Sequence, residues 1–262
     1  MLAQDSQLGV KLARDIVISG IGQADDTALM SNSLHCIQNL LRLSLTYCAK
    51  ANVELCADKT VLQAIAPRSL ATEVEYLKEF SPVEMNKTKL AFHENAEHVG
   101  IIRSVSGNLP NIMSRISLHT KAIAAVLHVG AARGHRANPV AGLKLHRLFG
   151  APVLMSGLGA LVLNKLEISL VNSHHHKVIQ NLLRLKPRTP HGVCLFLAAL
   201  PGEALLHLRQ LSILGMIIES EGSILHKHGL NALSSKPSSH SWFNQLKDLC
   251  LEYQLQHPLT CM

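Results

Sequence analysis

Residues 16–30 read IVISGIGQADDTALM, in which two short apolar runs flank a turn-forming segment. The β-branched run 16–18 favours extended backbone, whereas the two glycines and the adjacent pair Asp25 and Asp26 favour a tight bend. This order predicts a β-hairpin with residues 23–26 at or near its tip.

An amphipathic helix is predicted directly after the hairpin, with Asn32 or Ser33 as its N-cap. Its apolar residues recur at helical spacing opposite a polar face, and they are Leu34, Ile37, Leu40, Leu41, Leu45 and Cys48. Residues 53–55 and 61–65 then suggest a second pair of strands.

From Leu109 to Met216 the pattern is mostly helical, with breaks expected at 130–139, 150–152 and 187–192. A polar segment, 234–241, indicates a linker before a short C-terminal segment. The predicted fold class is therefore α+β, with short antiparallel strands and an amphipathic helix followed by a mainly helical region.

Composition agrees with helices packed on helices, because apolar residues make up 47% of the 262-residue chain and aromatic residues only 3%. Six cysteines without a close pair are read as free thiols in a reducing compartment. The longest segment without a charge or histidine, 148–163, contains a proline and glycines and is too short to span a membrane. No membrane association is expected.

The net charge of +7 is unevenly distributed, since residues 98–202 contain 12 basic side chains and one acidic side chain, Glu167. A sustained block of one sign attracts a polyanion, because each phosphate contact releases condensed counterions. The alternative is a solvated basic face that improves solubility. The residues singled out as nucleic-acid contacts are Arg103, Arg115, Lys121, Arg133, Arg136, Lys144 and Arg147.

Asp25 and Asp26 are the candidate metal ligands, because adjacent carboxylates repel each other unless they are solvated or neutralised by a cation. Hard divalent cations such as Mg²⁺ prefer oxygen ligands of this kind. The alternative reading is a structural turn, since aspartate is a common turn residue.

The segment 20–29 resembles the Ala-Asp-Asp hairpin of reverse transcriptases from non-LTR (LINE-type) retrotransposons. Four further segments are similar to that family in the same order along the chain, namely 55–60, 98–100, 147–154 and 241–258. The resemblance implies the C-terminal part of a polymerase palm in residues 1–107, a basic helical thumb or connector in 108–233, and a linker with a short C-terminal segment in 234–262.

The resemblance also implies an activity, that of an RNA-directed DNA polymerase using two metal ions. Asp25 and Asp26 would be catalytic Mg²⁺ ligands, Lys59 would act near the incoming triphosphate, and the partners would be an RNA template and a DNA primer. The fingers and a further catalytic aspartate of the family are expected upstream, so the chain alone is expected to be inactive. A nuclear or cytoplasmic location is expected. The alternative is a non-catalytic helical module that binds nucleic acid or acts as a scaffold.

Overall fold

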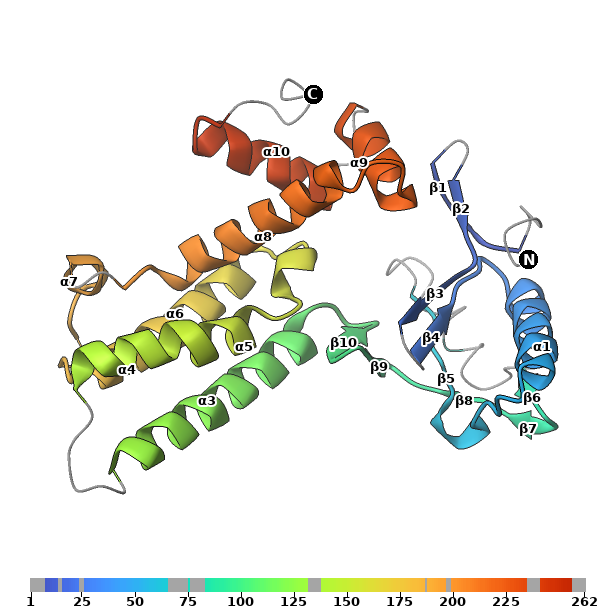
Figure 1. The fold of residues 1–262 in the computed structure, drawn as a ribbon, viewed down its shortest axis with the longest axis horizontal. Coiled ribbons are helices and arrows are strands. Elements are labelled where there is room, and N and C mark those ends of the chain that lie inside the picture. Colours follow the sequence, from blue (N-terminus) through green and yellow to red (C-terminus); the bar gives the residue numbers. More distant parts are fainter. Residues whose placement is uncertain are drawn as a thin grey trace. The chain divides into compact units, whose positions relative to one another are not determined.

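The computed structural model describes residues 8–13, 16–23, 26–65, 75, 83–131, 138–186, 188–196, 199–234 and 241–255. The chain forms two compact units, residues 1–107 and 108–262. Strands lie in unit 1 and most helices in unit 2, which confirms the α+β class (Figure 1).

The described strands of unit 1 are short and pair only two by two. They are β1 (Val10–Ala13), β2 (Ile16–Ile18), β3 (Gly20–Gln23), β4 (Asp26–Leu29), β5 (Val61–Leu62), β6 (Glu84–Met85), β7 (Thr88–Lys89), β8 (Ala91–Phe92), β9 (Asn95–His98) and β10 (Ile101–Ser104). Antiparallel pairs join β1 to β2, β3 to β4, β6 to β7 and β9 to β10.

The hairpin tip predicted at residues 23–26 is confirmed by the β3–β4 pair, in which Gln23 lies opposite Asp26 and Gly20 opposite Leu29. The β-branched run 16–18, expected to precede the turn as a strand of this hairpin, instead forms β2 and pairs with β1. A backbone hydrogen bond of 2.8 Å from the Met30 N–H to the Ser19 carbonyl extends the pairing beyond the strands. The two residues that join the strands, including Asp25, lie outside the described residues. The local turn chemistry was therefore sufficient to predict the position of the turn but not the strand that pairs with β4.

The amphipathic helix is α1 (Leu34–Lys50), and Ser33 is its N-cap, because the Ser33 side chain accepts a hydrogen bond from the Cys36 N–H. Its buried face packs into a cluster that contains Leu41, Val83, Met85 and Leu90. Gln38 also bridges to β6, donating to the Glu84 carbonyl and accepting from the Glu84 N–H. Helix α1 thus gives unit 1 its apolar core.

The prediction of a second strand pair from residues 53–55 and 61–65 was wrong. Residues 53–55 form no strand, the turn η1 (Ala57–Lys59) follows them, and β5 pairs in parallel with β8, about thirty residues further along the chain. The expectation that all strands would be antiparallel fails at this pair. The partner of β5 is distant in sequence, so local patterns could not identify it.

Unit 2 is built from helices, and its described elements are α3 (Leu109–Ala131), α4 (Pro139–Leu145), the π-helical turn η3 (His146–Gly150), α5 (Ala151–Met155), the 3₁₀ turn η4 (Leu158–Ala160), α6 (Lys165–Leu183), α7 (His191–Phe196), α8 (Gly202–Glu219), α9 (Ile224–Ser234) and α10 (Trp242–Glu252). The break between α6 and α7 agrees with the prediction, whereas most of the break predicted at 130–139, residues 132–137, lies outside the described residues.

The break predicted at residues 150–152 is absent, because helical backbone runs from α4 through η3 into α5. Pro152 lies at the start of α5, directly after the π-helical turn and within this continuous helical backbone. The chain leaves the helix after Met155 instead, at Gly157, whose positive φ of 74° favours glycine.

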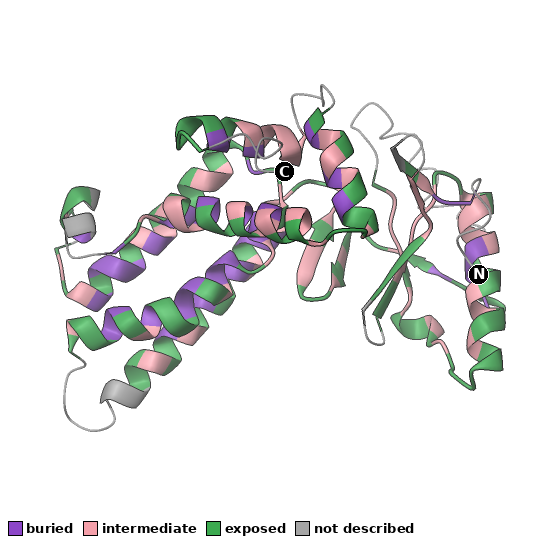
Figure 2. Cartoon of the chain, turned by 45° about the horizontal axis from the view of Figure 1, so that its top comes forward, coloured by how far each residue is buried: buried purple, intermediate pink, exposed green. Residues whose placement is uncertain are grey.

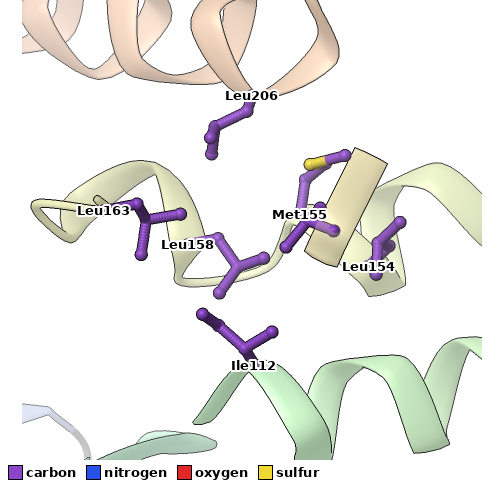
Figure 3. Close-up of a cluster of buried hydrophobic side chains, with 7 residues drawn as sticks. Ile112, Leu154, Met155, Leu158, Leu163 and Leu206 are labelled. Carbon is purple, nitrogen blue, oxygen red and sulfur yellow. The ribbon is translucent and has the colours of Figure 1, made fainter. Parts of the chain in front are cut away.

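The main core of unit 2 is a layer of aliphatic side chains between α3 and α8. Figure 3 shows Leu158 between Ile112 of α3 and Leu206 of α8, and all three are almost fully buried. Figure 2 shows buried residues along the helices of this unit, whereas the strands of unit 1 are mostly intermediate or exposed. Packing of helix against helix therefore holds unit 2 together.

The C-terminal segment belongs to this unit, since α10 packs on α8 through a cluster containing Leu214, Leu246 and Leu249. Trp242 links the start of α10 to η4, because its indole N–H donates a hydrogen bond to the Gly159 carbonyl at 2.8 Å. Gln245 adds a second link by donating to the Leu163 carbonyl.

We expect Leu158→Ala to lower the free energy of unfolding by about 2–5 kcal/mol, because it empties space in a closed core. The control is Leu166→Ala, since Leu166 is 83% exposed and its removal should change stability by less than about 0.5 kcal/mol. Urea unfolding followed by Trp242 fluorescence measures both. Equal losses in the two variants would contradict the assigned core.

Candidate functional site

Asp26 is the described member of the acidic pair and is the first residue of β4, next to the turn of the hairpin. Its side chain is exposed, so its carboxylate faces solvent. Asp25 lies outside the described residues. An exposed carboxylate beside a turn can bind a divalent cation weakly, but a tight site needs further oxygen ligands.

Lys59 is the last residue of η1 and is exposed. The turn that carries it is closed by Thr60, whose hydroxyl donates to the Cys56 carbonyl at 2.8 Å. Among the described residues no ion pair or hydrogen bond joins Lys59 to Asp26. The structure thus places both residues in unit 1 without bringing them into contact.

The basic side chains predicted to contact phosphate do not form one set. Arg103 is exposed on β10 of unit 1, whereas Lys121, Lys144 and Arg147 are exposed on α3, α4 and η3 of unit 2. Arg115 is buried, with 7% of its surface exposed, and so does not present its guanidinium at the surface. Arg133 and Arg136 lie outside the described residues.

Further exposed basic residues of the block 98–202 are Lys165, Lys177, Arg184, Lys186 and Arg188. The only acid in the whole basic block, Glu167, is already engaged at the start of α6. Its carboxylate accepts from the Asn164 N–H at 2.8 Å and from the Asn108 amide at 3.3 Å. This carboxylate therefore stabilises a helix N-terminus.

A cluster of four histidines inside unit 2 was not predicted as a site. His119 comes from α3, His146 from η3, and His174 and His175 from α6. His119, His146 and His175 are at most 2% exposed, and His174 is half-buried. Figure 1 shows α3 and α6 within the helical unit, and α3 contacts both η3 and α6. We call these four residues the histidine cluster.

The rings of the histidine cluster contact one another directly. His119 Nδ1 lies 2.9 Å from His174 Nε2, and His119 Nε2 lies 3.2 Å from His146 Nε2, so both nitrogens of His119 share hydrogen bonds with other imidazoles. The His146 and His175 ring centroids are 5.1 Å apart. Such mutual bonds need one ring to donate and the other to accept, as neutral imidazoles do.

Burial and like charges keep these rings uncharged. Desolvation, with His146 and His174 nearby, lowers the pKa of His119 to about 3. Desolvation, with Arg147 nearby, lowers the pKa of His146 to about 4. The pKa of His175 falls to about 3, mainly by desolvation, and the pKa of His174 also falls through desolvation and Lys177.

Part of this cluster could have been inferred from periodicity. His119 lies seven residues after Ile112 and four before Ile123, on the buried face of α3. The consecutive residues His174 to His176 fan around α6, and the His176 Nε2 lies 3.1 Å from the Thr189 carbonyl, outside the cluster. In the described part of the chain, no three His, Cys, Asp or Glu side chains are placed to hold one metal ion.

No family model, curated protein or solved structure matches this chain. Within the described residues, no helix is both long and apolar enough to cross a bilayer. The functional argument therefore depends on the chain's own geometry and charge.

We expect Gly150→Ala to destabilise the protein by about 1–3 kcal/mol, because a Cβ at this position has no room. It would lie 2.7 Å from Ile123 Cδ1, 2.9 Å from His146 Cδ2 and 3.2 Å from His119 Nε2. The control is Gly215→Ala in α8, where a Cβ would meet nothing within 4 Å and should stabilise by about 0.5–1 kcal/mol. Thermal unfolding distinguishes them, and a stabilised Gly150→Ala variant would refute the packing.

Proposed function

We propose that the chain is a palm-and-thumb part of an RNA-directed DNA polymerase of the non-LTR retrotransposon type, and that its helical unit binds the phosphate backbone of template and primer. The single observation that carries the binding proposal is the charge of unit 2. Exposed lysines and arginines extend over α3, α4, η3 and α6, and the only acid among residues 98–202 is engaged in a helix cap.

The spacing of these side chains supports contact with a backbone. Lys144 and Arg147 are three residues apart on one continuous helical segment, so the two side chains share a face. Few aromatic side chains are available for stacking on bases. Binding through phosphates positions a nucleic acid without reading its sequence.

The polymerase part of the proposal depends on the hairpin and on the family resemblance. Asp25 and Asp26 would supply carboxylate ligands to Mg²⁺, and the exposed carboxylate of Asp26 beside the turn fits a hard cation. Bound Mg²⁺ would stabilise charge on the transferring phosphoryl group. Lys59, which is exposed in the same unit, would add a positive charge near the triphosphate.

The second candidate is a non-catalytic nucleic-acid-binding module. It is favoured by the absence of contact between Lys59 and Asp26 among the described residues, and by two compact units in which the basic block falls mainly in one. Both candidates predict binding to a polyanion. They differ in whether the hairpin binds a divalent cation.

We expect the double variant Lys144→Glu with Lys177→Glu to weaken binding of a labelled RNA–DNA hybrid. The plot of log affinity against log salt should lose about 0.9 in slope for each contact removed, with affinity falling about tenfold or more at low salt. Fluorescence anisotropy at several salt concentrations measures this. The control is Arg42→Glu with Lys227→Glu, which changes the charge equally at two exposed positions outside the block. Equal losses would leave only a general charge effect and reject the proposed surface.

We expect Asp25→Asn with Asp26→Asn to reduce Mn²⁺ affinity about tenfold or more, because carboxylate oxygens are the preferred ligands of such ions. The matched control is Glu54→Gln with Asp58→Asn, two exposed carboxylates of the same unit. Paramagnetic broadening of backbone NMR signals from residues 20–29 locates the ion. Unchanged broadening in the first variant would reject the polymerase reading and favour the binding module.

A further inference from the structure

We propose that the histidine cluster is an acid-sensitive lock, which holds unit 2 closed near neutral pH and releases the packing of α3, η3 and α6 under mildly acidic conditions. The inference is independent of the proposed nucleic-acid function, because it concerns the interior of the helical unit. It starts from geometry: three imidazoles share two hydrogen bonds, each of which needs an uncharged acceptor ring, and the His175 ring lies against His146 with the ring centroids 5.1 Å apart.

Protonation would disrupt those bonds at once. A protonated imidazole has two donors and no acceptor, so neither His119–His174 nor His119–His146 can keep its hydrogen bond if both partners are charged. Positive charges in direct contact and out of water are strongly unfavourable. The Nε2 atom of His175 is buried and makes no hydrogen bond in the described part of the chain, so no partner is present there to accept a proton carried by this atom.

Among the residues that the structure describes, the charged groups that shift the pKa values of the cluster histidines are all basic or imidazole groups. The basic residues on the packed segments include Arg115 on α3, Lys144 on α4, Arg147 on η3, and His176 and Lys177 on α6. Beside His175 a small pocket also includes Cys194, whose pKa is raised by burial, so that thiol stays neutral. On α8, Gly202 contacts His175, and the adjoining Glu203 is exposed.

The direction of the pH effect follows from the pKa values. The pKa of each cluster histidine is lowered in the folded protein, to about 3 for His119 and His175 and about 4 for His146, whereas an unfolded chain has the ordinary 6.5. The stability they contribute is complete above pH 6.5 and is lost as the pH falls below it, because only the unfolded chain takes up protons.

The expected size is large. Between about pH 7 and pH 5, each such histidine multiplies the unfolding constant by about 25, so three give on the order of ten-thousand-fold. A domain with ordinary stability of about 5–15 kcal/mol would become marginal over this range.

The experiment is urea unfolding of the full chain at a series of pH values between about 5 and 7. The only tryptophan, Trp242, lies in unit 2 and reports its unfolding by fluorescence. We expect the wild-type chain to take up about three to four protons on unfolding near pH 5.5, read from the slope of the logarithm of the unfolding constant against pH. An uptake below about one proton would overturn the proposal.

Variants assign the effect to the cluster. His175→Leu should lower the proton uptake by about one, because it removes one titrating ring, and should lose less stability than wild type between about pH 7 and pH 5. The matched control, His128→Gln, replaces an exposed histidine on α3 and should leave the uptake unchanged. If His175→Leu fails to fold, His174→Asn, at the half-buried end of the cluster, provides the same comparison. Equal uptake in a folded cluster variant and in wild type would overturn the proposal.

Discussion

Contact between uncharged imidazole rings is the constraint on which the helical unit depends. His119 is bonded through both ring nitrogens, so α3 cannot shift relative to η3 or α6 without breaking one of these bonds. Gly150 allows the close approach, because any side chain there would meet Ile123 and His146. The π-helical turn carries His146 inward while Arg147 remains exposed. Polar contacts in this core therefore select one arrangement of helices.

The aliphatic layer around Leu158 also stabilises unit 2, but its apolar contacts are less directional than the hydrogen bonds between the imidazoles. Apolar side chains from α3, α5, η4 and α8 fill it, and burial of each contributes about 1.5–3 kcal/mol relative to exposure. Helix α10 closes the other side of α8 through Leu246 and Trp242. Unit 1 has a smaller core, centred on Leu41, Met85 and Leu90, and its strands pair only two by two. The two units consequently differ in how much packing holds them.

The positive charge of unit 2 has one effect at its surface and another in its interior. Outside, lysines and arginines lie on the helices of unit 2 and favour a polyanionic partner. Inside, the same positive field from Arg147 and Lys177 helps to keep the neighbouring imidazoles neutral. The basic character of residues 98–202 thus bears on both the proposed binding and the response to acid. Glu167 is excluded from either role by its place in the capping box.

Local features were determined by the sequence itself. The turn of the β3–β4 hairpin, the Ser33 cap, the amphipathic face of α1 and the break around residues 184–190 follow from turn propensity and periodicity, which act between near neighbours. The concentration of basic residues is likewise a property of composition and order. For the acidic pair, sequence predicted the hairpin that carries Asp26, while its role as a metal ligand remains a prediction.

Only the tertiary structure decided which distant residues meet. It paired β5 with β8, and it buried Arg115, which had been expected at the surface. It also continued a helix through Pro152 and brought His119, His146, His174 and His175 together. Each of these outcomes depends on side chains far apart in the chain, whose contacts are selected by the packing of whole helices. A local pattern specifies which face of a helix is apolar, but it does not specify which other helix will cover that face.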